Sequence, residues 1–172
     1  MRSVLSIAPT GEPHVELQSD DRPFGLGWMP DGALIVVAMD TQTLLRRAPG
    51  EAAVICFADL SQNSPGVAGH LNDLVIDRNG NIYVGLDPDF TTHGFRSEFG
   101  SIIHIDTKGH ACVAASGLHF PNGMVVTGDS TRLIVAETGA PRLTAFDIGP
   151  SGTLAQRSVW GLADAPSAPA VR

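Results

Sequence analysis

Two asparagines are the residues of this sequence whose type and spacing could do chemistry. Asn72 lies in the string His-Leu-Asn-Asp, and Asn122 lies in the string Phe-Pro-Asn-Gly. A carboxamide offers a neutral carbonyl oxygen, which can bind a hard cation or the hydroxyls of a sugar-like ligand. Asparagine is equally at home in turns, where its side chain bonds to nearby backbone. From spacing alone the turn interpretation is favoured, and the binding interpretation stays open.

The two asparagines occupy the same place in a repeat. Phe24, Asn72 and Asn122 follow one another at spacings of 48 and 50 residues, and a turn and an apolar run follow each of them. Repeats of this length that each contain a hairpin are typical of β-propeller blades. Because the residues that begin the inner strands gather around the central channel, we expect Asn72 and Asn122 to face one channel.

Turn residues divide the repeats into short apolar runs, and these runs predict four strands per blade. Asn79-Gly80 between two such runs predicts a hairpin with a type I′ turn. No stretch shows sustained helical periodicity, so the sequence predicts an all-β fold. The expected strands cover 25–29, 34–38, 43–47 and 53–58 in the first repeat, 74–77, 81–85 and 101–106 in the second, and 123–127, 133–137, 142–147 and 156–160 in the third.

The chain has 172 residues, which at roughly 49 residues per repeat is about three and a half blades. Closed propellers usually have about 4–8 blades, so a single partial propeller domain is expected over residues 1–172. Its expected parts are a remnant of a preceding blade (1–22), three repeats (23–69, 70–119 and 120–162) and an Ala/Pro-rich tail (163–172).

Composition excludes several classes of function. The net charge is −7 and Lys and Arg are not clustered, which argues against nucleic acid as a partner. The sequence shows no signal peptide and no apolar run long enough for a membrane helix, so we expect a cytoplasmic protein without membrane contact. Cys56 and Cys112 lack metal-site spacing and have apolar neighbours, which predicts buried free thiols rather than a disulfide or a zinc site.

Other candidate residues have weaker signals. His70 precedes the asparagine corner and could line the channel, although a hydrogen-bonded loop histidine is the commoner case. His93, Arg96 and Glu98 lie on the longest irregular insert and could contact a substrate, although a plain surface loop explains them as well. Glu137 ends an apolar run and could face the end of the channel. The motifs of serine hydrolases, zinc proteases and P-loop enzymes do not occur.

Several strings resemble one known family, the SMP-30/gluconolactonase/LRE family. The resemblance covers most of residues 22–162 and implies a six-bladed propeller that hydrolyses lactones. It also implies one divalent cation in the central channel, most often Ca²⁺, with Zn²⁺ or Mg²⁺ as alternatives. The matching strings are Arg-Pro-Phe-Gly-Leu-Gly-Trp-Met-Pro-Asp-Gly at 22–32, His-Leu-Asn-Asp-Leu-Val-Ile-Asp at 70–77, Phe-Pro-Asn-Gly-Met at 120–124, Leu-Ile-Val-Ala-Glu at 133–137 and Arg-Leu-Thr-Ala-Phe-Asp at 142–147.

The resemblance implies roles for three residues and leaves the catalytic residue unassigned. Asn122 matches the metal-ligating asparagine of the family's Pro-Asn-Gly motif. Asn72 matches a channel asparagine that contacts substrate or metal-bound water. His70 stands where several members place a substrate-binding arginine, so it is a candidate for substrate binding here.

The sequence also departs from the family pattern. The family's first metal ligand is a Glu in a Glu-Gly-Pro motif, whereas the similar string Gly11-Glu12-Pro13 lacks the intervening glycine and is interpreted as a chance likeness. A further Asp ligand belongs to a Pro-Asp-Gly motif that opens the fourth blade, which this sequence does not reach. The chain is therefore expected to correspond to the middle of a family member.

Three hypotheses follow for the function. In the first, the chain belongs to a hydrolase that opens a sugar-type or small lactone with a metal ion, and its chemistry requires blades outside this chain. In the second, it is a non-catalytic propeller segment that forms a homo-oligomer through its open blade edges or binds a partner. In the third, the chain is a truncated product without a stable fold.

Overall fold

In the computed structural model, residues 1–61, 69–88 and 100–161 are described. Within these ranges the chain forms β-strands joined by turns and contains no helix, in agreement with the all-β prediction. None of the described residues therefore belongs to a helix that could span a membrane. The loop candidates His93, Arg96 and Glu98 and the tail from 163 onwards lie outside the described residues.

Three four-stranded antiparallel sheets follow one another along the chain, and in each the strand order in space is the order in sequence. They are preceded by a hairpin of β1 (Arg2–Ile7) and β2 (Pro13–Ser19). The first sheet contains β3 (Pro23–Trp28), β4 (Leu34–Ala38), β5 (Thr43–Arg47) and β6 (Val54–Asp59). The second contains β7 (Gly69–Ile76), β8 (Ile82–Pro88), β9 (Gly100–Ile105) and β10 (Ala111–Leu118). The third contains β11 (Pro121–Val126), β12 (Arg132–Glu137), β13 (Arg142–Ile148) and β14 (Leu154–Gly161).

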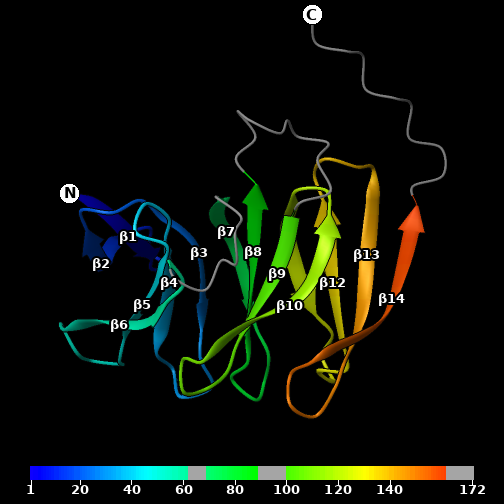
Figure 1. Ribbon diagram of the computed structural model, residues 1–172. Coiled ribbons are helices and arrows are strands. Elements are labelled where there is room, and N and C mark those ends of the chain that lie inside the picture. Colours follow the sequence, from blue (N-terminus) through cyan, green and yellow to red (C-terminus); the bar gives the residue numbers. More distant parts are fainter. Residues whose placement is uncertain (62–68, 89–99, 162–172) are drawn as a thin grey trace, which may run out of the picture.

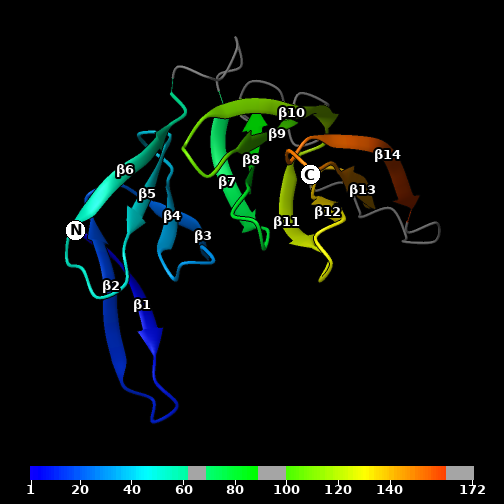
Figure 2. The ribbon, with the colours of Figure 1, turned by 90° about the horizontal axis from the view of Figure 1, so that it is seen from below.

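The sheets stand side by side as blades of an arc (Figures 1 and 2). Strand β7 packs beside β3 on one side and beside β11 on the other, so these three strands border the inner side of the arc. The outer side is formed by β6, β10 and β14. This is a β-propeller architecture of about three and a half blades, as the repeat spacing predicted.

Apolar side chains fill the spaces between neighbouring blades. One buried cluster joins the first and second blades and includes Val37 and Ile82, and another joins the second and third blades and includes Tyr83 and Val135. Because side chains alternate along a strand, consecutive residues of β8 enter different clusters. The hydroxyl of Tyr83 also donates a 3.0 Å hydrogen bond to the carbonyl oxygen of Gly152. The second blade is thus packed on both faces.

Gly25 brings β3 against the backbone of β7. A Cβ atom at Gly25 would lie 2.6 Å from the backbone nitrogen of Leu74, 2.7 Å from Cα of Asp73 and 2.8 Å from the carbonyl oxygen of Asn72. All three atoms belong to the backbone and cannot rotate away. The close approach of the first two blades therefore requires glycine at this position.

We expect Gly25→Ala to lower the free energy of unfolding by about 1–3 kcal/mol, because the added methyl group must push two blades apart. The matched control is Gly123→Ala in β11, where the added Cβ would meet nothing within 4 Å. That variant should stay within about 0.5 kcal/mol of the parent. Urea denaturation of the three proteins measures the difference, and equal stability of both variants would contradict the close-packing argument.

The hairpin at Asn79-Gly80 forms, but its predicted turn type is wrong. Among the described residues Gly80 has a positive φ of 86° whereas Asn79 does not, so the pair cannot make a type I′ turn. The backbone N–H of Gly80 instead donates to the carbonyl of Asp77 at 3.1 Å, and that of Asp77 donates to the carbonyl of Asn81 at 2.9 Å. Oδ1 of Asp77 accepts two further backbone N–H groups of the turn at 2.8 Å, which explains how a hairpin one residue longer is stabilised.

The prediction that both cysteines are buried is also wrong. Cys56 and Cys112 are free and exposed. They lie in β6 and β10, the outermost strands of their blades, where one strand face and one edge meet solvent. The apolar neighbours of each cysteine in the sequence could not predict this exposure, because the burial of a strand depends on its place in the sheet, and β6 and β10 are edge strands.

Candidate functional site

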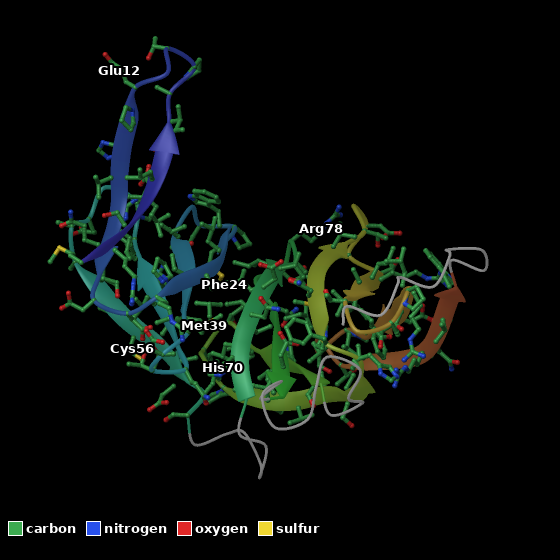
Figure 3. All side chains as sticks on the ribbon, turned by 90° about the horizontal axis from the view of Figure 1, so that it is seen from above. Glu12, Phe24, Met39, Cys56, His70 and Arg78 are labelled. Atoms are coloured by element: carbon green, nitrogen blue, oxygen red, sulfur yellow. The ribbon has the colours of Figure 1, made fainter. Side chains whose placement is uncertain are left out.

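A cavity of about 330 Å³ lies at the inner-strand ends of the three blades. The three residues to which the family resemblance gives roles, His70, Asn72 and Asn122, all line it. Phe24, Met39 and His70 lie near one another where the first two blades meet (Figure 3). The complete lining consists of Arg22, Phe24, Met39, His70, Asn72, Asp87, Phe120 and Asn122.

Each inner strand carries an irregularity at the position of its repeat residue. The register against the second strand shifts between Pro23 and Leu26, between Leu71 and Leu74, and between Pro121 and Met124. Phe24, Asn72 and Asn122 fall within these three shifts. Because a bulge re-aims the side chains that it contains, the repeated irregularity gives a local reason why all three residues reach the cavity.

Asp87, at the end of β8, is a site residue that sequence reasoning missed. It lies next to Asn72 in the folded blade, and the Nδ2 group of Asn72 donates a 2.6 Å hydrogen bond to Oδ2 of Asp87. The carboxyl group is buried, with only 3% of the residue exposed. Its second oxygen, Oδ1, is buried without a hydrogen-bond partner among the described residues.

The surroundings of Asp87 disfavour its charged form. Burial raises the pKa of its carboxyl group, the hydrogen bond from Asn72 lowers it and the nearby charge of Asp73 raises it, so that together they bring the pKa to about 7. The carboxyl group is therefore partly protonated near neutral pH when the cavity is empty. A positive charge bound beside it would favour the carboxylate.

Asn122 in the third blade makes the same kind of contact as Asn72. Its Nδ2 group donates a 3.1 Å hydrogen bond to Oγ1 of Thr138, the residue directly after β12. In the first blade the corresponding residues are Phe24 and Met39. The second residue of this pair is therefore apolar in the first blade (Met39), acidic in the second (Asp87) and hydroxylic in the third (Thr138).

The two basic residues of the cavity have different environments. Arg22 is bound to a neighbouring carboxylate, since both its Nε and Nη2 atoms lie 2.6 Å from Oδ1 of Asp40. His70 is exposed and pairs with Asp87 across the β7–β8 ladder. Its imidazole is thus placed at the rim, where it can meet a ligand that enters the cavity.

Glu137 does not line this cavity, so the suggestion that it faces the channel is wrong for the described part of the chain. Its buried carboxylate accepts 2.9 Å hydrogen bonds from Nε and Nη2 of Arg142, a 2.7 Å bond from the backbone N–H of His119 and a bond from Oγ1 of Thr144. Burial alone would raise the pKa of Glu137, but these hydrogen bonds outweigh it and hold the pKa below its usual value. Glu137 is therefore a structural ion-pair residue.

The structure also separates the Glu-Pro string from the site. Glu12 lies at the far tip of the β1–β2 hairpin, away from Phe24, Met39 and His70 (Figure 3). It cannot take part in a site at the inner strands unless the hairpin reorganises. This placement agrees with its interpretation as a chance likeness.

The donor chemistry of the cavity fits a hard divalent cation. The amide N–H groups of Asn72 and Asn122 are used in hydrogen bonds to their own blades, which leaves their carbonyl oxygens for a ligand. Oxygen donors suit Ca²⁺ or Mg²⁺. Among the described residues there is no group of three or more His, Cys, Asp or Glu side chains that could hold a metal by themselves. Because Ca²⁺ takes about 6–8 oxygen ligands, water or other segments must supply the remainder.

Comparison with known proteins gives a consistent result. The sequence model of the SMP-30/gluconolactonase/LRE-like region matches residues 2–169. The chain is 31% identical over 99 residues to diisopropyl-fluorophosphatase from Loligo vulgaris, a match that covers 52% of this chain and 32% of that protein.

Solved structures show the same fold at low sequence identity. A calcium-binding protein, regucalcin, from Agrobacterium tumefaciens is 20% identical with a TM-score of 0.68, over 87% of this chain and 48% of that one. A gluconolactonase from Xanthomonas campestris is 24% identical with a TM-score of 0.69, over 91% of this chain and 54% of that one. The chain thus spans about half the length of these two structures and about a third of the Loligo vulgaris protein. With the family match extending over nearly its whole length, the chain belongs to the SMP-30/gluconolactonase/LRE-like family.

Proposed function

We propose that this chain forms part of the active site of a metal-dependent hydrolase that opens a sugar-type or small lactone. The observation that supports this most directly is the convergence of Asn72, Asp87 and Asn122 on one cavity at the inner-strand ends of the three blades. These residues supply oxygen atoms and one buried carboxyl group to a space large enough for a small ring. Membership of the family supplies the class of reaction.

The oxygens of Asn72 and Asn122 would hold the cation, with Ca²⁺ the best match for such neutral, hard donors. When bound, a divalent cation polarises a lactone carbonyl and increases the acidity of an attacking water molecule. The hydrogen bond to Asp87 fixes the orientation of the Asn72 amide, and the bond to Thr138 does the same for Asn122. The chain's own contribution is thus to position the donors before substrate arrives.

Three apolar residues of the cavity lining suit the carbon atoms of a lactone ring. They are Phe24, Met39 and Phe120, while the exposed His70 can meet polar substituents. Phe120 has a φ of 55°, which costs a residue with a side chain about 1–3 kcal/mol unless its surroundings hold it there. We interpret this strain as the means by which the ring of Phe120 is directed towards the cavity.

A second candidate function is a non-catalytic propeller segment that self-associates or binds a partner. It is favoured by apolar side chains on the outward faces of the end blades. Leu26 and Trp28 of β3 are exposed, on the side opposite to the glycines that contact the second blade, and Trp160 of β14 is exposed at the other end. Such faces are normally covered in a propeller.

Hydrolysis of a panel of sugar-type and alkyl lactones by the purified chain tests the first proposal. Any activity should be removed by a chelator and restored by added Ca²⁺, because the proposed reaction depends on the metal. Asn122→Ala should lower this activity by at least about 10–100-fold, the range seen even for outer-shell changes at metal sites. The control is Asn79→Ala, since Asn79 is exposed on a turn and does not line the cavity.

Two outcomes would contradict the proposal. Activity that Asn122→Ala leaves unchanged would place any hydrolysis elsewhere. Absence of activity in folded protein, together with oligomers of defined size in sedimentation, would favour the non-catalytic segment. Circular dichroism of the parent and both variants keeps loss of fold separate from loss of the site.

A further inference from the structure

We propose that Asp87 is a direct ligand of the divalent cation, through its Oδ1 atom. This inference rests on the cation site in the proposed function and adds a charged ligand to it. The family resemblance pointed to Asn122 as the metal ligand and to Asn72 as a contact for substrate. Asp87 enters because of its position in the folded blade.

The first argument is the unpartnered oxygen. Oδ1 of Asp87 is buried and has no hydrogen-bond partner among the described residues, although Oδ2 is bound to Asn72 at 2.6 Å. Leaving a buried acceptor unsatisfied costs about 1–3 kcal/mol, and more if the group is charged. Native structures rarely keep such an atom unless a ligand, an ion or water completes it. Since Asp87 lines the cavity, its missing partner can come from there.

The second argument is the lack of a protein counter-charge. The cavity contains one arginine, Arg22, and both nitrogens that it uses are already bound to Asp40 at 2.6 Å. His70 is placed opposite Asp87 across the ladder, but no hydrogen bond or ion pair joins their side chains within the described part of the chain. A buried carboxylate needs a partner of opposite charge, and a bound cation would provide it.

The third argument is the common orientation of the neighbouring amides. Asn72 and Asn122 both direct their N–H groups to acceptors on their own blades, so the carbonyl oxygens are left for the cavity. Together with Oδ1 of Asp87 they form a set of three oxygens from two adjacent blades. One negative charge among neutral oxygens is a ligand set that favours Ca²⁺ or Mg²⁺ over the softer transition metals.

Equilibrium dialysis with radioactive Ca²⁺, in the absence of any substrate, tests the assignment. We expect the parent chain to bind Ca²⁺ with a Kd of about 1 mM or tighter, the weak end of protein calcium sites. Asp87→Asn should weaken binding at least about 10-fold, because it removes the charge and keeps the shape. Asp73→Asn is the matched control, because it removes a nearby charge that does not line the cavity; its Kd should stay within about 3-fold of the parent.

The outcomes separate this inference from the proposed function. Equal Ca²⁺ affinity of Asp87→Asn and the parent would overturn it, as would an absence of Ca²⁺ binding by the folded parent chain. Binding that depends on Asp87 in a protein without lactonase activity would sustain the ligand assignment and remove the proposed reaction. A shift of the melting temperature on adding Ca²⁺, present in the parent and Asp73→Asn but absent in Asp87→Asn, provides a second readout.

Discussion

Replacing Glu137 by alanine should lower the free energy of unfolding by about 3–5 kcal/mol, the range for breaking one half of a buried ion pair. The side chain of Glu137 is fully buried, and both of its oxygens accept hydrogen bonds from Arg142 at 2.9 Å. Alanine would remove the buried carboxylate that binds Arg142 and the backbone N–H of His119. Urea denaturation near neutral pH measures the loss.

The exposed pair of Arg132 and Asp147 is the matched control for Glu137. Its atoms lie 3.1 Å apart on neighbouring strands of the same blade, but both side chains are about half exposed. Asp147→Ala should therefore cost no more than about 1 kcal/mol. Similar losses in Asp147→Ala and Glu137→Ala would show that burial does not decide the strength of these pairs.

In the presence of a chelator, Asp87→Asn should raise the free energy of unfolding at pH 8 by about 2–4 kcal/mol relative to the parent. The folded pKa of Asp87 is about 7 against an ordinary value of 3.8, and each unit corresponds to about 1.36 kcal/mol. Because the folded pKa is raised, the stability linked to this group is complete below pH 4 and is lost as the pH rises through 7. Because asparagine cannot ionise, the variant does not lose stability in this way as the pH rises.

Denaturation curves at pH 4 and pH 8 measure this effect. The advantage of Asp87→Asn over the parent should be small at pH 4 and largest at pH 8. Asp20→Asn removes the same charge from an exposed position and should show no such dependence. A parent and Asp87→Asn whose difference in stability is the same at both pH values would contradict an elevated pKa. Added Ca²⁺ should reverse the order of the two proteins, if Asp87 binds the cation.

The arrangement of the blades could be predicted from sequence because the repeat signal is local and occurs three times. The expected strands 34–38 and 43–47 agree in full with β4 and β5, where turns with glycine bound runs of apolar residues. The inner strands begin earlier than expected. The register shifts interrupt their alternation, so residues 23–24 and 121–122 look like turns in the sequence, although Pro23 and Pro121 are paired in the sheet.

The site could be predicted only in part. Asn72 and Asn122 were found because they occupy equivalent positions, and the structure places both at one cavity. Asp87 was not among the predicted site residues, since in the sequence it stands at the start of the longest irregular insert. Its spacing from Asn72 is 15 residues, the same as from Phe24 to Met39. Projecting that hairpin length onto the second repeat would have placed Asp87 beside Asn72. Its burial, by contrast, depends on packing between blades, which no local pattern contains.

The two-sided packing of the second blade has a consequence for local opening. Asn72 and Asp87 sit on a blade whose second strand enters both interior clusters, so exposing this pair to solvent requires separating blades on two sides. Asn122 belongs to the third blade, whose far face carries exposed side chains such as Val125. A cation bound by Asn72, Asp87 and Asn122 would connect the second blade, which is well protected from local opening, to the third blade, which is less protected. It would thereby act as a cross-link that slows amide exchange in the third blade more than in the second.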